Sequence, residues 1–429
     1  MAVMCQWRII FFEYFEVPLT KLLPMIKKQA IQYWLTLIIG LFTTVSCIDP
    51  YKVTVQATQS YLIVEGTITD LDEPQTISIF ETSETANFKS SQFTSTISPK
   101  SSDIIPVSKA KVLVIENGQK TYELFESQAG YYSTPLNFVG TIGSSYKLII
   151  EKSTGERYES TEEKMFSVPE IGTLYDKFNQ KGIKDNNSST GNIATNDIYI
   201  DYIDPATERN FYRWKWTSYE LQNICASCKQ GYYERTGNTA TSDGKCIQDI
   251  RLPGFNYYDY FCEALCWDIF QGKEIDIFSD VYTDGQTQYD KVVAQIPVYQ
   301  SNPCLVVVQQ MSLSANAFRY LKLIEDQSEN TGTLADTPPA PIKGNVTNTK
   351  NNNEIVLGYF SASAVSEVRY MMNRQNTVGA VKDGLFKYQT RRDPTPESES
   401  DERPNIPFAV CKPSVSRTAI APKNWQFGR

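Results

Sequence analysis

Cysteine is the residue type in this chain most able to take part in covalent or metal chemistry, because the chain has nine cysteines and no histidine. Without histidine, Ser-His-Asp and Cys-His catalysis are excluded, as are zinc sites that use imidazole ligands. Carboxylate pairs, Ser-Lys arrangements and thiols remain. The positions of the cysteines therefore carry most of what the sequence says about chemistry.

Five cysteines lie close together in a tyrosine- and glycine-rich stretch at about 222–270: Cys225, Cys228, Cys246, Cys262 and Cys266. The first two and the last two could supply four thiolates to zinc, but their spacing is irregular for a compact zinc ribbon. Disulfide bonds among these five and Cys411 are the favoured interpretation, because thiols pair in an exported chain. Cys304 opens the apolar run 305–308, and we expect it to be buried and free.

Cys47 has a different setting from the other cysteines. Lys27 and Lys28 precede an apolar run at 33–45 that ends in small residues before Cys47, which is typical of a lipoprotein signal peptide. We therefore expect residues 1–46 to be a leader, with the natural start at Met25, and Cys47 to become an acylated N-terminus. A transmembrane helix from Ala30 is disfavoured because the run is too short. Cleavage by a general signal peptidase stays open.

Residues 47–167 read as a series of short strands with glycine turns. Apolar and polar residues alternate at 75–80, and two apolar runs flank an Asn-Gly pair at 117–118, which is a strong hairpin signal. Strands at this spacing predict an immunoglobulin-like β-sandwich.

Residues 168–390 predict a second β-rich domain, with one helix and the cysteine-rich insertion. At 212–216 aromatic and basic residues alternate, so we expect one buried and one solvated face, with the basic side chains able to lie over neighbouring rings. Ser314 is the predicted N-cap of the helix. Residues 391–429 are expected to be a flexible linker and tail.

The net charge of −8 argues against nucleic acid as a partner. Aromatic residues of the insertion are candidate contacts for a glycan or peptide, although they could equally pack the insertion itself: Tyr232, Tyr233, Tyr257, Tyr258 and Tyr260. Carboxylates that could serve a hydrolase, or simply be solvated, are Asp201, Asp204, Glu263 and Asp268. No cofactor or metal is expected.

Several short motifs together resemble a known family. They are 62–70 (LIVEGTITD), 107–112 (VSKAKV), 130–132 (GYY), 143–148 (GSSYKL), Leu313-Ser314 before a helix with Tyr320, 338–346 (PPAPIKGNV), 357–363 (LGYFSAS) and Pro422 with Trp425. In this order the chain resembles domain-of-unknown-function family 4249, outer-membrane lipoproteins of Bacteroidota found beside TonB-dependent receptors.

The resemblance implies a location and a neighbourhood rather than a reaction. We expect a lipid-anchored, surface-exposed outer-membrane protein that assists a TonB-dependent nutrient transporter, as an accessory or substrate-binding partner. A carboxylate-dependent surface hydrolase and a structural or adhesive surface protein are the alternatives.

Overall fold

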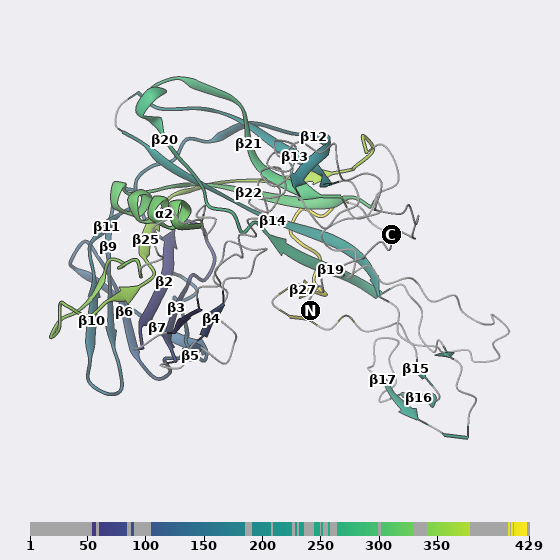
Figure 1. Cartoon of the computed structure of the whole chain (residues 1–429), viewed down its shortest axis with the longest axis horizontal. Helices are drawn as coiled ribbons and strands as arrows, with labels where there is room; N and C mark the ends of the chain where they lie inside the picture. The colour runs from purple at the N-terminus through teal and green to yellow at the C-terminus, as the bar shows by residue number, and fades with distance from the viewer. Residues whose placement is uncertain are drawn as a thin grey trace, which may run out of the picture. The chain divides into compact units, whose positions relative to one another are not determined.

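The chain folds mainly into β-sheets, and the part that the structure describes contains one α-helix, so the predicted fold class is confirmed (Figure 1). The structure is a computed structural model. It describes residues 54–56, 60–83, 87–89, 104–184, 191–206, 209–224, 264–298, 302–328 and 341–377, short pieces between 228 and 257, and 411–426 without 412 and 415. All of these residues belong to one compact unit, Thr54–Arg429.

The first sheet is strongly bent around a core. Its strands are β2 (Leu62–Thr69), β3 (Thr76–Thr82), β5 (Ile104–Pro106), β6 (Lys111–Glu116), β7 (Lys120–Gln128), β8 (Tyr131–Ser133), β9 (Ser145–Glu151), β10 (Arg157–Ser160), β11 (Glu163–Lys164), β23 (Val346–Asn348), β24 (Val356–Leu357) and β25 (Phe360–Ser363). The first half of β7 pairs with β6 and its second half with β8. Val64 and Ile79 on one side, and Val114 and Leu148 on the other, share one hydrophobic cluster, as in a sandwich.

The β6–β7 hairpin turns where the sequence predicted it. Asn117 and Gly118 have φ values of 51° and 66°, and Gln119 N donates a hydrogen bond to Glu116 O at 3.0 Å. Asn-Gly suits this turn because both central residues must adopt a left-handed backbone.

The C-terminal part of the chain returns to complete this first sheet. β24 and β25 pair in parallel with β2, and β23 pairs with β10 (Figure 1, where green β25 lies beside purple β2). Gly358 has φ 84°, and a Cβ there would lie 2.2 Å from Val64 O. Only glycine therefore fits this close approach of two backbones. The sandwich is built from two separate stretches of sequence.

The remaining strands form two further sheets and several small ones. The three-stranded sheet consists of β12 (Ile171–Lys184), β13 (Asn192–Ile203) and β21 (Thr287–Pro297). The six-stranded sheet consists of β26 (Val365–Met372), β22 (Cys304–Ser312), β14 (Phe211–Ile224), β19 (Ala264–Gln271), β27 (Arg417–Thr418) and β20 (Asp276–Ser279). Two-stranded pairs are β1 (Thr54–Gln56) with β4 (Asn87–Lys89), β15 (Cys228–Lys229) with β18 (Asn256–Tyr257), and β16 (Gly231–Arg235) with β17 (Gly244–Gln248).

A second hydrophobic cluster joins the three-stranded and six-stranded sheets. Ile198 and Ile200 of β13 and Val293 of β21 belong to it together with Trp214 of β14 and Val306 of β22. The alternation at 212–216 therefore buries its aromatic face, as predicted.

The buried carboxylate of Glu163 joins the two stretches of sequence that build the sandwich. Its side chain is 2% exposed and accepts hydrogen bonds from four donors. The donors are Thr161 Oγ1 at 3.0 Å, Tyr359 Oη at 2.8 Å, Asn345 Nδ2 at 3.2 Å and Ser314 Oγ at 2.6 Å. One carboxylate thus joins β11 to the segments around β23 and β25 and to the start of the helix.

The helix α2 (Ala315–Ser328) begins at this carboxylate. Ser314 Oγ donates to Glu163 and accepts a hydrogen bond from Ala317 N at 3.1 Å, which is the N-cap contact that the sequence predicted. Phe318 of the helix packs against Phe211 of β14, with ring centroids 4.7 Å apart. The hydrogen bonds of Ser314 therefore join the sandwich to the start of the helix, and the contact between Phe318 and Phe211 joins the helix to the six-stranded sheet.

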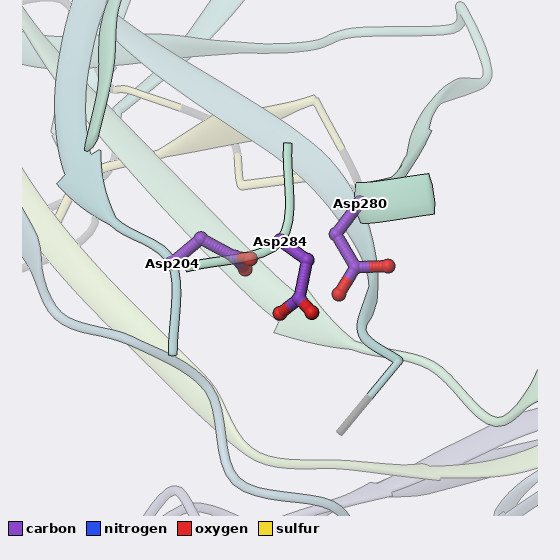
Figure 2. Close-up of side chains that lie close together, drawn as sticks. All are labelled: Asp204, Asp280 and Asp284. Atoms are coloured by element: carbon purple, nitrogen blue, oxygen red, sulfur yellow. The ribbon is translucent and has the colours of Figure 1, made fainter. Parts of the chain in front are cut away.

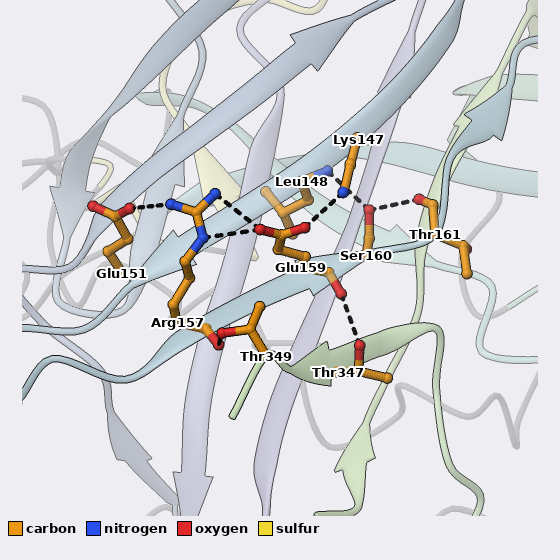
Figure 3. Close-up of polar contacts among 9 residues, drawn as sticks. All are labelled: Lys147, Leu148, Glu151, Arg157, Glu159, Ser160, Thr161, Thr347 and Thr349. Atoms are coloured by element: carbon orange, nitrogen blue, oxygen red, sulfur yellow. Dashed lines mark hydrogen bonds and ion pairs between the residues drawn. The ribbon is translucent and has the colours of Figure 1, made fainter. Parts of the chain in front are cut away.

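Ion pairs cover the polar side of β9 and β10 (Figure 3). Glu159 lies 2.6 Å from Lys147 and 2.9 Å from Arg157, and Thr347 Oγ1 donates to Glu159 O at 3.4 Å. The cations Lys147 and Arg157 hold the pKa of Glu159 below its ordinary value. These side chains are partly exposed, so each pair contributes less than about 1 kcal/mol to stability.

Replacing Glu163 by Gln should destabilise the protein by about 2–3 kcal/mol, because an amide nitrogen would then face donors in a buried site. Urea denaturation of the two proteins measures the difference. The control is Glu162→Gln, which changes the adjacent exposed residue and should leave the midpoint unchanged. Equal midpoints for the two variants would contradict the role assigned to Glu163.

Candidate binding cleft

A cleft of about 820 Å³ lies along the edge of β14. β20 pairs with residues 211–214 of β14 and β19 with residues 217–224, so Lys215 and Trp216 lie between the two partner strands. The chain bridges this interval through Gly272, whose N donates to Trp216 O at 3.1 Å. A side chain at 272 would meet the indole of Trp216, with a Cβ 2.4 Å from its Nε1. The gap between the partner strands is where the cleft opens.

Charged and aromatic side chains dominate the wall of the cleft. The walls come from β12, β14, β21, β22 and the connection between β19 and β20. The charged and aromatic lining residues are Lys184, Arg213, Lys215, Lys291, Glu274, Asp276, Trp214 and Trp216. Cations therefore outnumber anions in the wall, although the whole chain carries a net charge of −8.

Two of the charged residues neutralise each other. Lys291 Nζ lies 2.8 Å from Asp276 Oδ1 and 4.6 Å from the ring centroid of Trp214. Burial raises the pKa of Asp276, and the charge of Lys291 opposes this shift. The cation over the tryptophan ring is therefore Lys291 from β21. The sequence had suggested that the basic residues of β14 itself would lie over these rings, and the structure shows no such contact for them in the part it describes.

Arg213 and Lys215 differ from Lys291, because the negative charge that acts on both of them comes from Glu65 of β2, which does not line the cleft. They are next but one to each other on β14 and so lie on the same face of the strand. Arg213 Nε is buried without a hydrogen-bond partner, and no ion pair involves either side chain among the described residues. Burial lowers the pKa of Arg213, an effect that the charge of Glu65 opposes.

Lys215 is the more accessible of the two cations. Burial within the walls of the cleft, followed by the charge of Arg213, lowers the pKa of Lys215 to about 8. Its side chain nevertheless remains exposed to solvent. The concave wall surrounds the amine with protein on several sides and leaves it open to solvent on one. The site thus presents an accessible amine beside an unpaired guanidinium.

Three carboxylates gather elsewhere, at the end of β20 (Figure 2). Oxygens of Asp204, Asp280 and Asp284 lie within 4.8 Å of one another, and η2 (Asp280–Tyr282) supplies the second of them. Oxygen ligands of this kind suit a hard cation.

Protein donors already occupy the two buried members of this cluster. Asp204 accepts hydrogen bonds from Tyr212 Oη at 2.6 Å and Gly285 N at 3.2 Å, and Asp280 accepts one from Asn210 N at 2.7 Å. Burial raises the pKa of Asp204, although its bond to Tyr212 opposes the shift. These contacts explain the cluster as the anchor of the turn at 280–286.

The other described carboxylates considered for hydrolysis each have a partner in the fold through one oxygen. Asp268 is buried, and its Oδ1 accepts a hydrogen bond from Arg417 Nε at 2.5 Å, whereas its Oδ2 has no hydrogen-bond partner among the described residues; Asp201 Oδ1 accepts a hydrogen bond from Asp290 N at 2.9 Å. Glu263 lies outside the described residues. The sequence pointed to Asp204 but not to its neighbours Asp280 and Asp284, since they come from a turn some 80 residues later in the chain.

The structure pairs two of the candidate cysteines. Cys266 of β19 forms a disulfide with Cys411, with Cα atoms 5.5 Å apart and 145 residues between them in sequence. Cys304 is a buried free thiol, as predicted, and burial raises its pKa well above the ordinary value. The bond holds the tail beside β19, where Trp425 packs on Trp267 with ring centroids 5.7 Å apart.

The other residues predicted to act in the insertion and the leader lie outside what the structure describes. This applies to the side chains of Cys225, Cys228, Cys246 and Cys262, and of Tyr232, Tyr233, Tyr257, Tyr258 and Tyr260, and to Cys47. The backbone register is described at two positions, where Cys228 pairs with Tyr257 and Tyr233 with Cys246. No described helix has the length and apolar character needed to cross a membrane.

Replacing Cys411 by Ser should lower the free energy of unfolding by up to about 5 kcal/mol, the chain-entropy value for so long a loop. It should also release the thiol of Cys266. Alkylation in denaturant without reductant, followed by mass analysis, should then find one more modified cysteine than in the wild-type chain. An unchanged count would exclude the Cys266–Cys411 bond.

The amine of Lys215 should react with an N-hydroxysuccinimide ester at lower pH than an ordinary lysine does. At a pKa of about 8, its unprotonated fraction at pH 7.5 is on the order of a hundred times that of a fully hydrated lysine. Peptide mapping across a pH series gives the titration curve. Arg213→Gln should move the curve to higher pH, because a neighbouring positive charge is lost. A curve still rising at pH 10 in the wild-type protein would contradict this prediction.

Comparison with known proteins identifies a family but no characterised relative. No curated protein and no solved structure is significantly similar to the chain. Residues 48–369 match the family described as "Domain of unknown function (DUF4249)", and this match covers most of the chain. The chain therefore belongs to the DUF4249 family.

Proposed function

We propose that the protein is a lipid-anchored lipoprotein of the bacterial outer membrane that serves a TonB-dependent nutrient transporter as its accessory or substrate-binding partner. The acyl anchor is on Cys47, and the β-sheets from Thr54 onward form the folded body. In this proposal the chain comes from the Bacteroidota, and its folded part faces the cell exterior.

The anchor rests on the order of the N-terminal residues. Lysines, an apolar run, small residues and Cys47 follow one another as in a lipoprotein signal. Acyl chains on Cys47 would hold the folded body at the bilayer, since each buried CH₂ contributes about 0.8 kcal/mol. The disulfide between Cys266 and Cys411 supports an exported protein, because such bonds persist in oxidising compartments.

The cleft beside β14 is the observation that supports a binding role. Its volume of about 820 Å³ falls in the range of about 300–1,000 Å³ usual for small-molecule sites. Trp216 contributes partly buried apolar surface, and Arg213 and Lys215 contribute charges that form no ion pair among the described residues. Convergent polar groups beside aromatic surface favour recognition of a polar ligand. By contrast, each described carboxylate considered for hydrolysis accepts a hydrogen bond within the fold, although Asp268 Oδ2 is buried without one.

A tagged copy of the protein purified from outer membranes should bring a TonB-dependent receptor with it. Mass spectrometry of the eluate identifies the partner. Cys47→Ser is the matched variant: it should lose labelling by a palmitate analogue and move from the membrane to the soluble fraction.

Two results would count against the proposal. A wild-type protein that carries no lipid and is found in the cytosol would refute the anchor. A lipidated protein that brings down no receptor would refute the partnership and leave the anchor intact.

A further inference from the structure

We propose that the cleft beside β14 binds a small organic solute through an oxyanion on that solute, a carboxylate, phosphate or sulfate, held by Arg213 and Lys215. This inference deepens the proposed substrate-binding role and rests on it. It names the chemical class of ligand, which the family description does not contain.

The first argument is that the fold supplies counter-ions where it uses cations structurally. Arg374 is fully buried, and its guanidinium lies 2.5 Å from Glu220, which is 1% exposed. Lys291 in the cleft itself is paired with Asp276. Arg213 and Lys215 lie in a chain with an excess of carboxylates, yet neither forms an ion pair within the described residues, and the one carboxylate whose charge acts on both, Glu65, lies outside the cleft wall.

The second argument is the energetic consequence of leaving these two charges together. Removing a cation from water is unfavourable unless it is paired and hydrogen-bonded, and two like charges add repulsion. Arg213 Nε is buried and makes no hydrogen bond in this state. A bound oxyanion would supply the missing acceptor and neutralise the repulsion between the two side chains.

The third argument is geometric. Residues next but one on a strand project from the same face about 7 Å apart along the backbone, within reach of a single polyatomic anion. A guanidinium presents a planar fork that matches carboxylate, phosphate and sulfate, and an ammonium adds a mobile point charge. Arg213 and Lys215 therefore combine the two kinds of cation that bind such groups best.

The size and walls of the cleft identify the ligand as organic. A volume of about 820 Å³ is far larger than one inorganic anion needs. Trp216 is a partly buried aromatic residue that lines the cleft from the opposite face of β14 to Arg213 and Lys215, and Gln271 and Gln295 add neutral hydrogen-bonding groups. These features suit the body of a polar solute, such as a sugar ring, with its charged group at Arg213 and Lys215.

The charge of the cleft wall differs in sign from the net charge of the protein, and this difference favours anionic ligands. The chain is acidic overall, whereas Lys184, Arg213 and Lys215 leave the cleft wall with more positive than negative charge once Lys291 and Asp276 are paired. Glu274 offsets part of this excess, and the remaining positive charge raises the local concentration of ligands of opposite sign. Anionic solutes are therefore favoured over neutral ones.

Isothermal titration calorimetry of the purified full chain in detergent, at low salt, tests the inference. The probes are glucuronate, glucose 6-phosphate and glucose 6-sulfate, with glucose as the neutral match. At least one charged sugar should bind, at least tenfold more tightly than glucose, and its affinity should fall as salt is raised. The three charged probes separate carboxylate, phosphate and sulfate as the recognised group.

The variants decide whether Arg213 and Lys215 are responsible. The double variant Arg213→Gln/Lys215→Gln should weaken binding at least tenfold, and the single variant Lys215→Gln, at an exposed position, gives a second measurement if the double variant unfolds. Lys111→Gln removes the same charge from an exposed position on β6 and should leave binding unchanged. Bound probe should also slow the modification of Lys215 by an amine-reactive ester.

Absence of heat with all three charged probes, or affinities that the cleft variants leave unchanged, would overturn the inference. Neither result depends on a receptor. A chain that co-purifies with a TonB-dependent receptor yet binds no anion would retain the proposed function and lose the ligand class. A chain that binds an anion through Arg213 and Lys215 but co-purifies with no receptor would retain the ligand class and lose the proposed partnership with a transporter.

Discussion

The buried carboxylate of Glu163 is the interaction on which the arrangement of the sheets depends. A carboxylate shielded from water is unfavourable unless its oxygens are hydrogen-bonded, and here both oxygens accept from side chains. Three of the four donors, Ser314, Asn345 and Tyr359, lie more than 150 residues later in the chain. Any structure that separates these segments from β11 leaves the charge unsatisfied, so this residue selects one arrangement of the late segments around the sandwich.

Ser312, two residues before the helix cap, joins the end of the sandwich to the six-stranded sheet that carries the cleft. Its Oγ donates to Phe166 O at 2.7 Å and accepts from Ala364 N at 2.9 Å, where the chain passes from β25 into β26. β26 then pairs along β22, and β22 along β14. The strand that carries Arg213 and Lys215 is therefore positioned through backbone pairing that begins at the sandwich. On this side the wall of the cleft is part of a continuous ladder of paired strands.

Local patterns predicted local structure well. Alternation gave the strands around 75–80 and 212–216, the Asn-Gly pair gave a hairpin, and Ser314 gave a helix cap, because each depends on neighbours within a few residues. Alternation could not show that residues 356–363 pair with β2. The pattern of a strand indicates which of its faces is buried, but it does not identify a partner strand nearly 300 residues away. The partner of Cys266 was hidden for the same reason.

The position of the cleft could not be predicted from the sequence. Alternation at 212–216 separates aromatic from basic residues, and a solvated basic face is the usual consequence. Nothing in that pattern shows that β19 ends and β20 begins on either side of Lys215, so that the strand edge opens into a cleft there. Two cations that would be ordinary on an open surface then lie in the wall of a cleft, without an ion pair among the described residues. Local rules that fail without compensation elsewhere in the fold tend to mark functional sites. The lack of a counter-ion is therefore better explained by a ligand's charge than by tolerance of a surface lysine and arginine.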